Sequence, residues 1–282
     1  MNILEQGLYI VSTPIGNLDD ITLRALEVLK KSDIILCEDT RRSLKLLNYY
    51  KIKKKLVSYH KFNEKKELQK IIEYLNEGKI LSLISDAGTP TLSDPGLLLI
   101  KTCIKRRIKV FPIPGPSSIT SATSISGFDD KFLFFGFLPK TENELIKVLS
   151  SLKNLEFSLV FFIPGIKINF YIKFFKEYFS NRDIVIAREI TKIHETFYRD
   201  NINTIKPFKT VLKGELTIVV SKINRSNDTE SKPDKNIIDQ AKKYLKKYSL
   251  KDVVELISIK EKISKKKIYD ICLAIKNDEK NN

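Results

Sequence analysis

The sequence has 282 residues, 42% of them hydrophobic, and a formal net charge of +16 at pH 7. This length is enough for about two domains with buried cores, and no apolar run reaches the length of a membrane span. Three distant cysteines, Cys37, Cys103 and Cys272, form neither a disulfide pattern nor a metal pattern, and two isolated histidines, His60 and His194, argue against a zinc site. We therefore expect no metal and no membrane partner.

The positive charge favours a polyanionic partner such as nucleic acid. A chain rich in lysine, isoleucine and asparagine also arises from a biased base composition, so the charge by itself leaves both interpretations open. The N-terminus lacks the basic and apolar regions of a signal peptide, and the unpaired cysteines suit a reducing compartment. We expect a cytoplasmic protein.

The first part of the chain alternates strand-like and helix-like segments. Helical patterns are expected over residues 19–33, 41–50 and 64–77, the last closed by Gly78, and again after Pro95. Compact apolar runs predict strands over residues 7–13, 33–38, 79–85 and 108–114. This alternation predicts an α/β domain over residues 1–115, with a parallel sheet flanked by helices.

A second α/β domain is expected over residues 116–223. Its strands are the phenylalanine-rich or β-branched runs at residues 131–137, 157–163, 183–189 and 215–222. Residues 224–235 contain few apolar side chains and are predicted to be a linker. Residues 236–282 have helical periodicity and form the third predicted domain, a small basic helical one.

The C-terminal segment is slightly basic. Residues 225–282 contain 15 Lys and Arg against 10 Asp and Glu. Two apolar-periodic segments flank a short turn near residues 262–264, which fits a helix-turn-helix with Lys265, Lys266 and Lys267 as RNA-binding candidates. A helical cap on the main body explains the pattern equally well, and both interpretations stay open.

Three loops at predicted strand ends are rich in glycine and proline. They read "STPIGN" at residues 12–17, "SDAGTPTLSDPG" at residues 85–96 and "PIPGPSS" at residues 112–118. None is a dinucleotide fingerprint or a Walker A loop. Because ligands of parallel α/β sheets bind beyond the carboxyl ends of the strands, the three loops together predict the wall of a cleft for a compact ligand.

Several motifs carry a family resemblance. "LYIVSTPIGNLDDITLRALEVLKKSDIILCEDTRRS", "LISDAGTPTLSDPG", "PIPGPSS", "GFLPK" and "AREITKIHET" occur in this order across roughly residues 7–221. They resemble the class III, tetrapyrrole-methylase-like methyltransferases. More closely, they are similar to the bacterial 16S ribosomal RNA (cytidine-2′-O)-methyltransferase family, which methylates a decoding-site ribose. The C-terminal segment resembles that family's helical domain.

The resemblance implies a cofactor, S-adenosylmethionine, folded into a cleft between the two α/β domains. The carboxylate of Asp86 can accept a hydrogen bond from a cofactor hydroxyl or amine, and Gly88 leaves room for the ligand. Asp94 and Pro95 are expected mainly to start the next helix as N-cap and first residue. The cofactor-binding positions that the resemblance implies are Pro14, Ile15, Gly16, Asp86, Ala87, Gly88, Thr89, Pro90, Ser117, Ser118, Ile119, Ala187 and Leu216.

Charged residues after two strands are the candidates for catalysis. The carboxylates of Glu38 and Asp39 could accept a hydroxyl proton while the Arg41 guanidinium holds a phosphate. Arg41 and Arg42 are also RNA-binding candidates. A helix-capping ion pair near Thr40 is the alternative reading of the same residues. Glu189 is a further catalytic candidate. Strand alternation is expected to place it on the face opposite Arg188 and Ile190, and His194 lacks the surroundings of a base.

One segment departs from the family pattern. Close relatives carry a Glu-Ser pair followed by an arginine, where this chain has Ile163, Pro164 and Lys167. We expect this change to remove polar groups near the cleft. The loss leaves three possibilities open, namely that these groups are dispensable, that the acceptor differs, or that activity is impaired.

Three functions follow from these features. The first is methylation of 16S ribosomal RNA, which the resemblance implies in the assembled small subunit and by a homodimer. The second is methylation of a small tetrapyrrole, which the basic C-terminal segment disfavours. The third is a non-catalytic RNA-binding or ribosome-assembly role, which the lost Glu-Ser…Arg groups favour.

Overall fold

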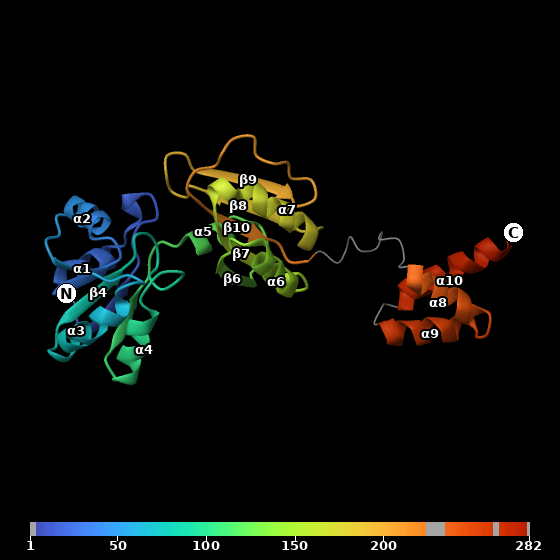
Figure 1. Ribbon diagram of the computed structural model, residues 1–282, viewed down its shortest axis with the longest axis horizontal. Helices are drawn as coiled ribbons and strands as arrows, with labels where there is room; N and C mark the ends of the chain where they lie inside the picture. Colours follow the sequence, from blue (N-terminus) through green and yellow to red (C-terminus); the bar gives the residue numbers. More distant parts are fainter. Residues whose placement is uncertain (1–3, 224–234, 262–264, 281–282) are drawn as a thin grey trace. The chain divides into compact units, whose positions relative to one another are not determined.

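The computed structural model describes residues 4–223, 235–261 and 265–280 (Figure 1). It divides into two compact units, residues 1–223 and 224–282. The predicted linker, except its last residue, and the predicted turn at residues 262–264 lie outside the described residues. None of the described helices is long and apolar enough to cross a membrane.

The first sheet confirms the predicted parallel arrangement. Its strands pair in the order β3-β2-β4-β1-β5, and every pair is parallel. The strand β3 was missed because it is short, begins with an exposed lysine and has no buried residue. The five strands are β1 (Gly7–Val11), β2 (Ile34–Cys37), β3 (Lys55–Ser58), β4 (Ile80–Ile84) and β5 (Val110–Ile113).

Four helices follow these strands. The first begins one turn later than the sequence suggested, because Thr22 rather than an aspartate is its N-cap and accepts a hydrogen bond from the backbone N–H of Ala25 at 3.1 Å. Gly78 follows the third helix in a left-handed conformation, φ +82°, which confirms its predicted role. The helices are α1 (Leu23–Lys31), α2 (Thr40–Tyr49), α3 (Glu64–Asn76) and α4 (Leu97–Lys105).

The second sheet is mixed. Its order is β6-β7-β10-β8-β9, in which only β6 and β7 pair in parallel. The strand β9 was missed because its residues are polar and only partly buried. The strands are β6 (Phe132–Phe137), β7 (Ser158–Pro164), β8 (Asp183–Arg188), β9 (Thr196–Asn201) and β10 (Glu215–Val220).

Each face of the second sheet has its own helices. On one face α6 (Glu142–Leu152) and α7 (Ile168–Tyr178) pack over a large apolar core. On the other face α5 (Ser118–Ser124), rich in small residues, contributes Ile119 and Ala122 to a smaller core. Because side chains alternate along a strand, Ile163 and Leu216 join the larger core, whereas their neighbours Phe162 and Thr217 face the α5 side.

The C-terminal unit is helical, as predicted. Its three helices, α8 (Lys235–Leu245), α9 (Leu250–Glu261) and α10 (Lys265–Lys280), share one apolar core. Cys272 lies in that core, and Cys37 and Cys103 are buried in the first unit, so all three cysteines are free and buried. The helices therefore gain their stability mainly from mutual packing.

Candidate active site

The three glycine-rich loops meet at the carboxyl edge of the first sheet. Thr13 and Gly88 exchange two backbone hydrogen bonds, each 2.9 Å long. The hydroxyl groups of Ser12 and Thr89 lie 2.9 Å apart, and Thr89 also donates to the carbonyl of Pro116 at 3.4 Å. The predicted clustering of these loops is thus confirmed, with each loop tied to the next.

Gly88 has a backbone conformation that favours glycine. Its φ is +80°, and a Cβ atom there would come within 3.3 Å of the Ile15 side chain. The glycine therefore allows the loop after β1 and the loop after β4 to approach each other closely.

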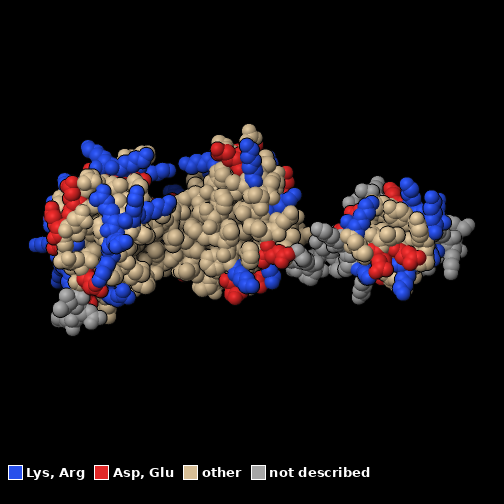
Figure 2. Space-filling model, turned by 90° about the horizontal axis from the view of Figure 1, so that it is seen from below, with Lys and Arg blue, Asp and Glu red and all other residues tan. Residues whose placement is uncertain are grey.

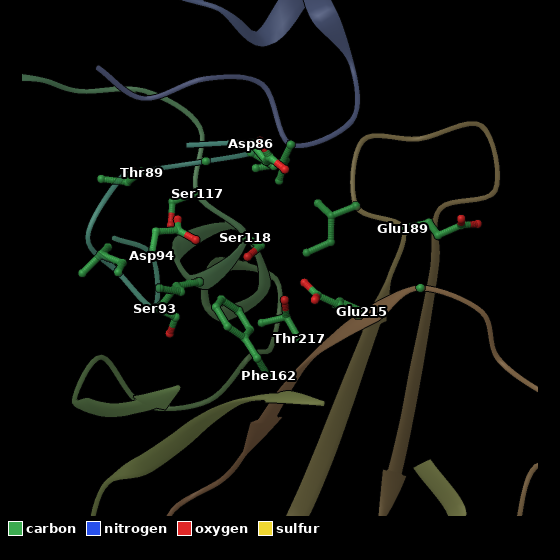
Figure 3. Close-up of a pocket in the computed structure, with 18 of the residues that line it drawn as sticks. Asp86, Thr89, Ser93, Asp94, Ser117, Ser118, Phe162, Glu189, Glu215 and Thr217 are labelled. Atoms are coloured by element: carbon green, nitrogen blue, oxygen red, sulfur yellow. The ribbon is translucent and has the colours of Figure 1, made fainter. Parts of the chain in front are cut away.

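A cavity of about 660 Å³ opens beside these loops (Figure 3). Its lining comes from both sheets of the first unit. It falls within the usual size range of small-molecule sites. Among the predicted cofactor residues, those that line it are Ile15, Asp86, Ala87, Gly88, Thr89, Ser117, Ser118, Ile119 and Ala187.

The remaining predicted cofactor residues lie elsewhere. Pro14 and Gly16 line a smaller adjoining cavity of about 400 Å³. Pro90 is buried and lines neither cavity. The Leu216 side chain belongs to the core on the opposite face of the sheet, and its neighbours Glu215 and Thr217 line the large cavity instead.

The large cavity is acidic. Among the described residues, only two cationic side chains, those of Arg42 and Lys192, belong to its lining. In the described residues, no three carboxylate, histidine or cysteine side chains converge closely enough to hold a metal ion. The lining carboxylates suit a cationic organic ligand, and they are Glu38, Asp86, Asp94, Glu189 and Glu215.

Asp94 is a site residue that sequence reasoning assigned wrongly. The helix α4 begins only at Leu97, and its N-cap is Gly96 with φ +127°, so Asp94 and Pro95 do not start it. Thr91 and Ser93 also have positive φ values, and this irregular turn carries Asp94 into the cavity. In Figure 3 its carboxylate and that of Glu215 point toward the space between them.

Burial raises the pKa of Asp94 to about 6, and the nearby Glu38 carboxylate adds to the rise, while a hydrogen bond with Ser85 opposes it. Burial also raises the pKa of Glu38, with the Asp86 carboxylate as the second cause. Two carboxyl groups in one cavity therefore hold their protons more tightly than free ones.

Asp86 is held in place by two contacts. One carboxylate oxygen accepts the backbone N–H of Asp39 at 3.2 Å, and the other lies 3.1 Å from a guanidinium nitrogen of Arg42. The two contacts fix the carboxylate at the boundary of both cavities, since Asp86 and Arg42 line each of them.

The four catalytic candidates separate in space. Asp39 is the N-cap of α2, and its carboxylate accepts from the backbone N–H of Arg41 at 2.9 Å and from the Arg41 guanidinium at 3.1 and 2.8 Å. These bonds hold the pKa of Asp39 at about 2. Neither residue lines a cavity, which matches the helix-capping reading, whereas Glu38 and Glu189 do line the large cavity.

Glu189 does not follow the predicted strand alternation. The strand β8 ends at Arg188, and Glu189 has a left-handed φ of +51°, so Glu189 and Ile190 both line the cavity. Its carboxylate lies 3.5 Å from the Arg188 guanidinium. Figure 3 shows it directed away from Asp94 and Glu215. The Glu38 carboxylate, by contrast, interacts electrostatically with that of Asp94.

The segment that departs from the family pattern lies at the end of β7. Ile163 is fully buried in the core beneath α7, and Lys167 is exposed with its ammonium 6.0 Å from the Phe170 ring. Neither these residues nor Pro164 lines a cavity. The expectation that the change removes polar groups from the cleft is therefore wrong for position 163, which alternation along β7 turns to the other face. Pro164 pairs with Glu215, a lining residue of the large cavity, and so lies at the cavity side of the sheet without lining the cavity itself.

The RNA-binding candidates are dispersed. Arg42 lines both cavities, whereas Arg41 is exposed on α2. Lys265 pairs with Glu255 at 3.1 Å, and the side chains of Lys266 and Lys267 lie outside the described residues. Figure 2 shows many Lys and Arg side chains over the half of the first unit that contains the first sheet, and mixed charge on the C-terminal unit.

Comparisons with known proteins identify relatives. A sequence model of the family described as "Tetrapyrrole (Corrin/Porphyrin) Methylases" matches residues 7–206. A Rickettsia prowazekii protein named "Ribosomal RNA small subunit methyltransferase I" is 42% identical over 274 residues, 95% of this chain and 97% of that one. A Thermotoga maritima protein of the same name is 45% identical over 217 residues, 76% of this chain and 97% of that one.

A solved structure shares the fold. It is a uroporphyrin-III C-methyltransferase from Thermus thermophilus complexed with S-adenyl homocysteine. Its TM-score is 0.53 at 13% identity, and the match covers 76% of this chain and 97% of that one.

Proposed function

Because the chain belongs to the tetrapyrrole methylase family and, within it, to the family of ribosomal RNA small subunit methyltransferase I, we propose that it methylates ribosomal RNA with S-adenosylmethionine. The acceptor that we propose is the ribose 2′-hydroxyl of a cytidine in the decoding site of 16S ribosomal RNA. Such a substrate places the protein in the cytoplasm. The observation that carries the proposal is the acidic cavity that shares a wall with a smaller, basic one.

The residues of the large cavity suit S-adenosylmethionine. The donor carries a sulfonium and an ammonium group, and five carboxylates line the cavity. Asp86, Thr89 and Ser118 would hold its polar groups, and the small side chain of Ala187 leaves room for its apolar parts. When bound, it supplies an electrophilic methyl group.

Glu38 is our candidate for the general base. It follows β2, lines the large cavity and lies near Arg42, which also lines the smaller one. Its raised pKa makes its carboxylate a stronger base toward a ribose hydroxyl than an exposed glutamate. Arg42, fixed by Asp86, is placed to orient the acceptor strand.

The non-catalytic alternative loses part of its support. It rested on the replaced residues at positions 163, 164 and 167, and these line neither cavity.

The test is transfer of a labelled methyl group from S-adenosylmethionine to small ribosomal subunits that lack the modification. The product is digested and the labelled nucleoside identified, with protein-free 16S RNA as a parallel substrate. Labelled 2′-O-methylcytidine is the expected result. Label on another nucleoside would change the acceptor, and no label despite measured cofactor binding would overturn the proposal.

A further inference from the structure

The smaller cavity has walls on two opposite sides. Helix α2 forms one wall, because Arg42, Lys45, Leu46 and Tyr49 recur at the spacing of one helical face. The opposite wall includes Lys192, from the loop after β8. With a volume of about 400 Å³, the cavity is large enough for a small organic group.

The charge of this cavity is positive. Within the described parts of the chain, Asp86 is its only acidic lining residue, and it is already paired with Arg42. In the part of the chain that the structure describes, neither Lys45 nor Lys192 forms an ion pair. Two lysine side chains outside any of the described ion pairs therefore belong to the lining of this cavity, and its positive balance suits an anionic ligand.

Lys192 is held opposite α2 by the fold. The backbone N–H of Asn17 donates to the Thr191 hydroxyl at 2.9 Å, and that of Thr191 donates to the Glu195 carboxylate at 2.6 Å. A Cβ atom on Gly16 would lie 2.6 Å from the Lys192 side chain and 2.8 Å from the Ile190 carbonyl. Only glycine permits this close contact, so the position of Lys192 is built into the first unit.

The rim of the cavity presents an aromatic ring. Tyr49 is 58% exposed and makes an edge contact with the ring of Tyr50, with centroids 4.9 Å apart. The Tyr50 hydroxyl is anchored on the Leu18 carbonyl, which steadies the pair. An exposed ring beside ammonium groups is the usual combination for a nucleobase and its phosphate.

We propose that the smaller cavity binds the acceptor nucleotide as a single unstacked unit, with Lys45 and Lys192 on phosphate and Tyr49 stacked on a base. This inference rests on the proposed function. The shared wall of Ile15, Asp86 and Ala87 brings the bound ribose to the edge of the cofactor cavity. The site takes single-stranded or flipped RNA, because a paired base cannot reach a ring at the rim of a cavity.

The test compares variants on small ribosomal subunits that lack the modification, with steady-state kinetics at saturating S-adenosylmethionine. Lys45→Glu and Lys192→Glu are each expected to raise KM for the subunits about 10-fold. The neutral variants Lys45→Ala and Lys192→Ala are each expected to lower the salt dependence of subunit binding by about one counterion. Tyr49→Ala is expected to reduce kcat/KM about 5- to 100-fold, and Tyr49→Phe to restore it. Lys66→Ala, an exposed lysine on α3 that lines neither cavity, is the matched control.

Calorimetric titration with S-adenosylmethionine separates a local effect from misfolding, since the Lys45 and Tyr49 variants, whose residues line only the smaller cavity, are expected to retain cofactor affinity. If the wild-type protein methylates the subunits and the Lys45, Lys192 and Tyr49 variants do so with the same kinetics, this inference is overturned and the proposed function stays intact. Absence of methylation by the wild-type protein would instead overturn the proposed function. Loss of activity in Tyr49→Phe as well as Tyr49→Ala would show that the hydroxyl, not stacking, is what matters.

Discussion

The two cavities of the first unit share five lining residues, yet they differ in charge. The larger has five carboxylates against two cationic side chains, whereas the smaller has three cationic side chains against one carboxylate. The common wall consists of Ile15, Arg42, Asp86, Ala87 and Lys192. A cationic donor and an anionic acceptor can thus be sorted by charge, and meet only where the wall is shared.

The strongest way to break this arrangement is to remove the proposed base. Glu38→Gln is expected to lower kcat for methyl transfer about 10²- to 10⁴-fold, because an amide cannot accept the hydroxyl proton. Cofactor affinity is expected to fall less than kcat, because four carboxylates remain in the lining. Single-turnover rates on small subunits give the measurement. Asp39→Asn, which keeps the helix cap and lines neither cavity, is the matched control. An equal loss in both variants would refute the role of Glu38.

The next effect concerns the shared carboxylate. Asp86→Asn is expected to weaken S-adenosylmethionine binding about 10- to 100-fold, because it removes a charge from the acidic cavity and frees the Arg42 guanidinium. Titration calorimetry provides the affinity, and the exposed Asp130→Asn variant is the control. Unchanged affinity in Asp86→Asn would show that the cofactor binds elsewhere.

A pH titration sharpens the comparison further. The pKa of Asp94 is raised to about 6, so this carboxyl loses its charge as the pH falls through about 6, well above its ordinary range. Affinity for the cationic cofactor is therefore expected to decline several-fold between pH 7 and pH 5. Asp94→Asn should bind with a flatter pH profile. The same profile for both proteins would exclude Asp94 from the cofactor site.

The smallest effect is on stability. A folded-state pKa above the unfolded value means that ionised Asp94 opposes folding, fully above pH 6 and not at all below about pH 4. The rise from 3.8 to about 6 corresponds to about 3 kcal/mol, and solvent screening in the cavity reduces this to about 1–2 kcal/mol. Asp94→Asn should raise the free energy of unfolding by that amount at pH 8. Urea denaturation at pH 8 and pH 4 checks both the gain and its disappearance.

Much of the first sheet could be predicted because its strands are continuous apolar runs between clear helix signals. The short strand β3 and the polar strand β9 lacked such runs, so pairing with neighbouring strands, rather than local sequence, determines them. The three loops could be placed together from the rule for parallel sheets alone.

Individual side chains of the site were harder to predict. Asp94 precedes a proline and matches a helix start, but the backbone turns around Gly96 before α4 begins. Ile163 stands where the family resemblance led us to expect a polar residue, and only the register with Leu216 shows that it faces the core. Glu215 and Thr217 became visible as lining residues only once the sheet fixed which face they occupy.

The loop contacts also determine when the site can exist during folding. The hydroxyl contact between Ser12 and Thr89 joins positions 77 residues apart, and Lys192 and Glu215 come from still later in the chain. Bringing residues so far apart in the sequence together costs chain entropy before their contacts can stabilise the fold. A nascent chain that has only its first sheet therefore has the glycine-rich loops but no enclosed cavity, and cofactor binding becomes a property of the completed unit, a signal that both sheets have folded.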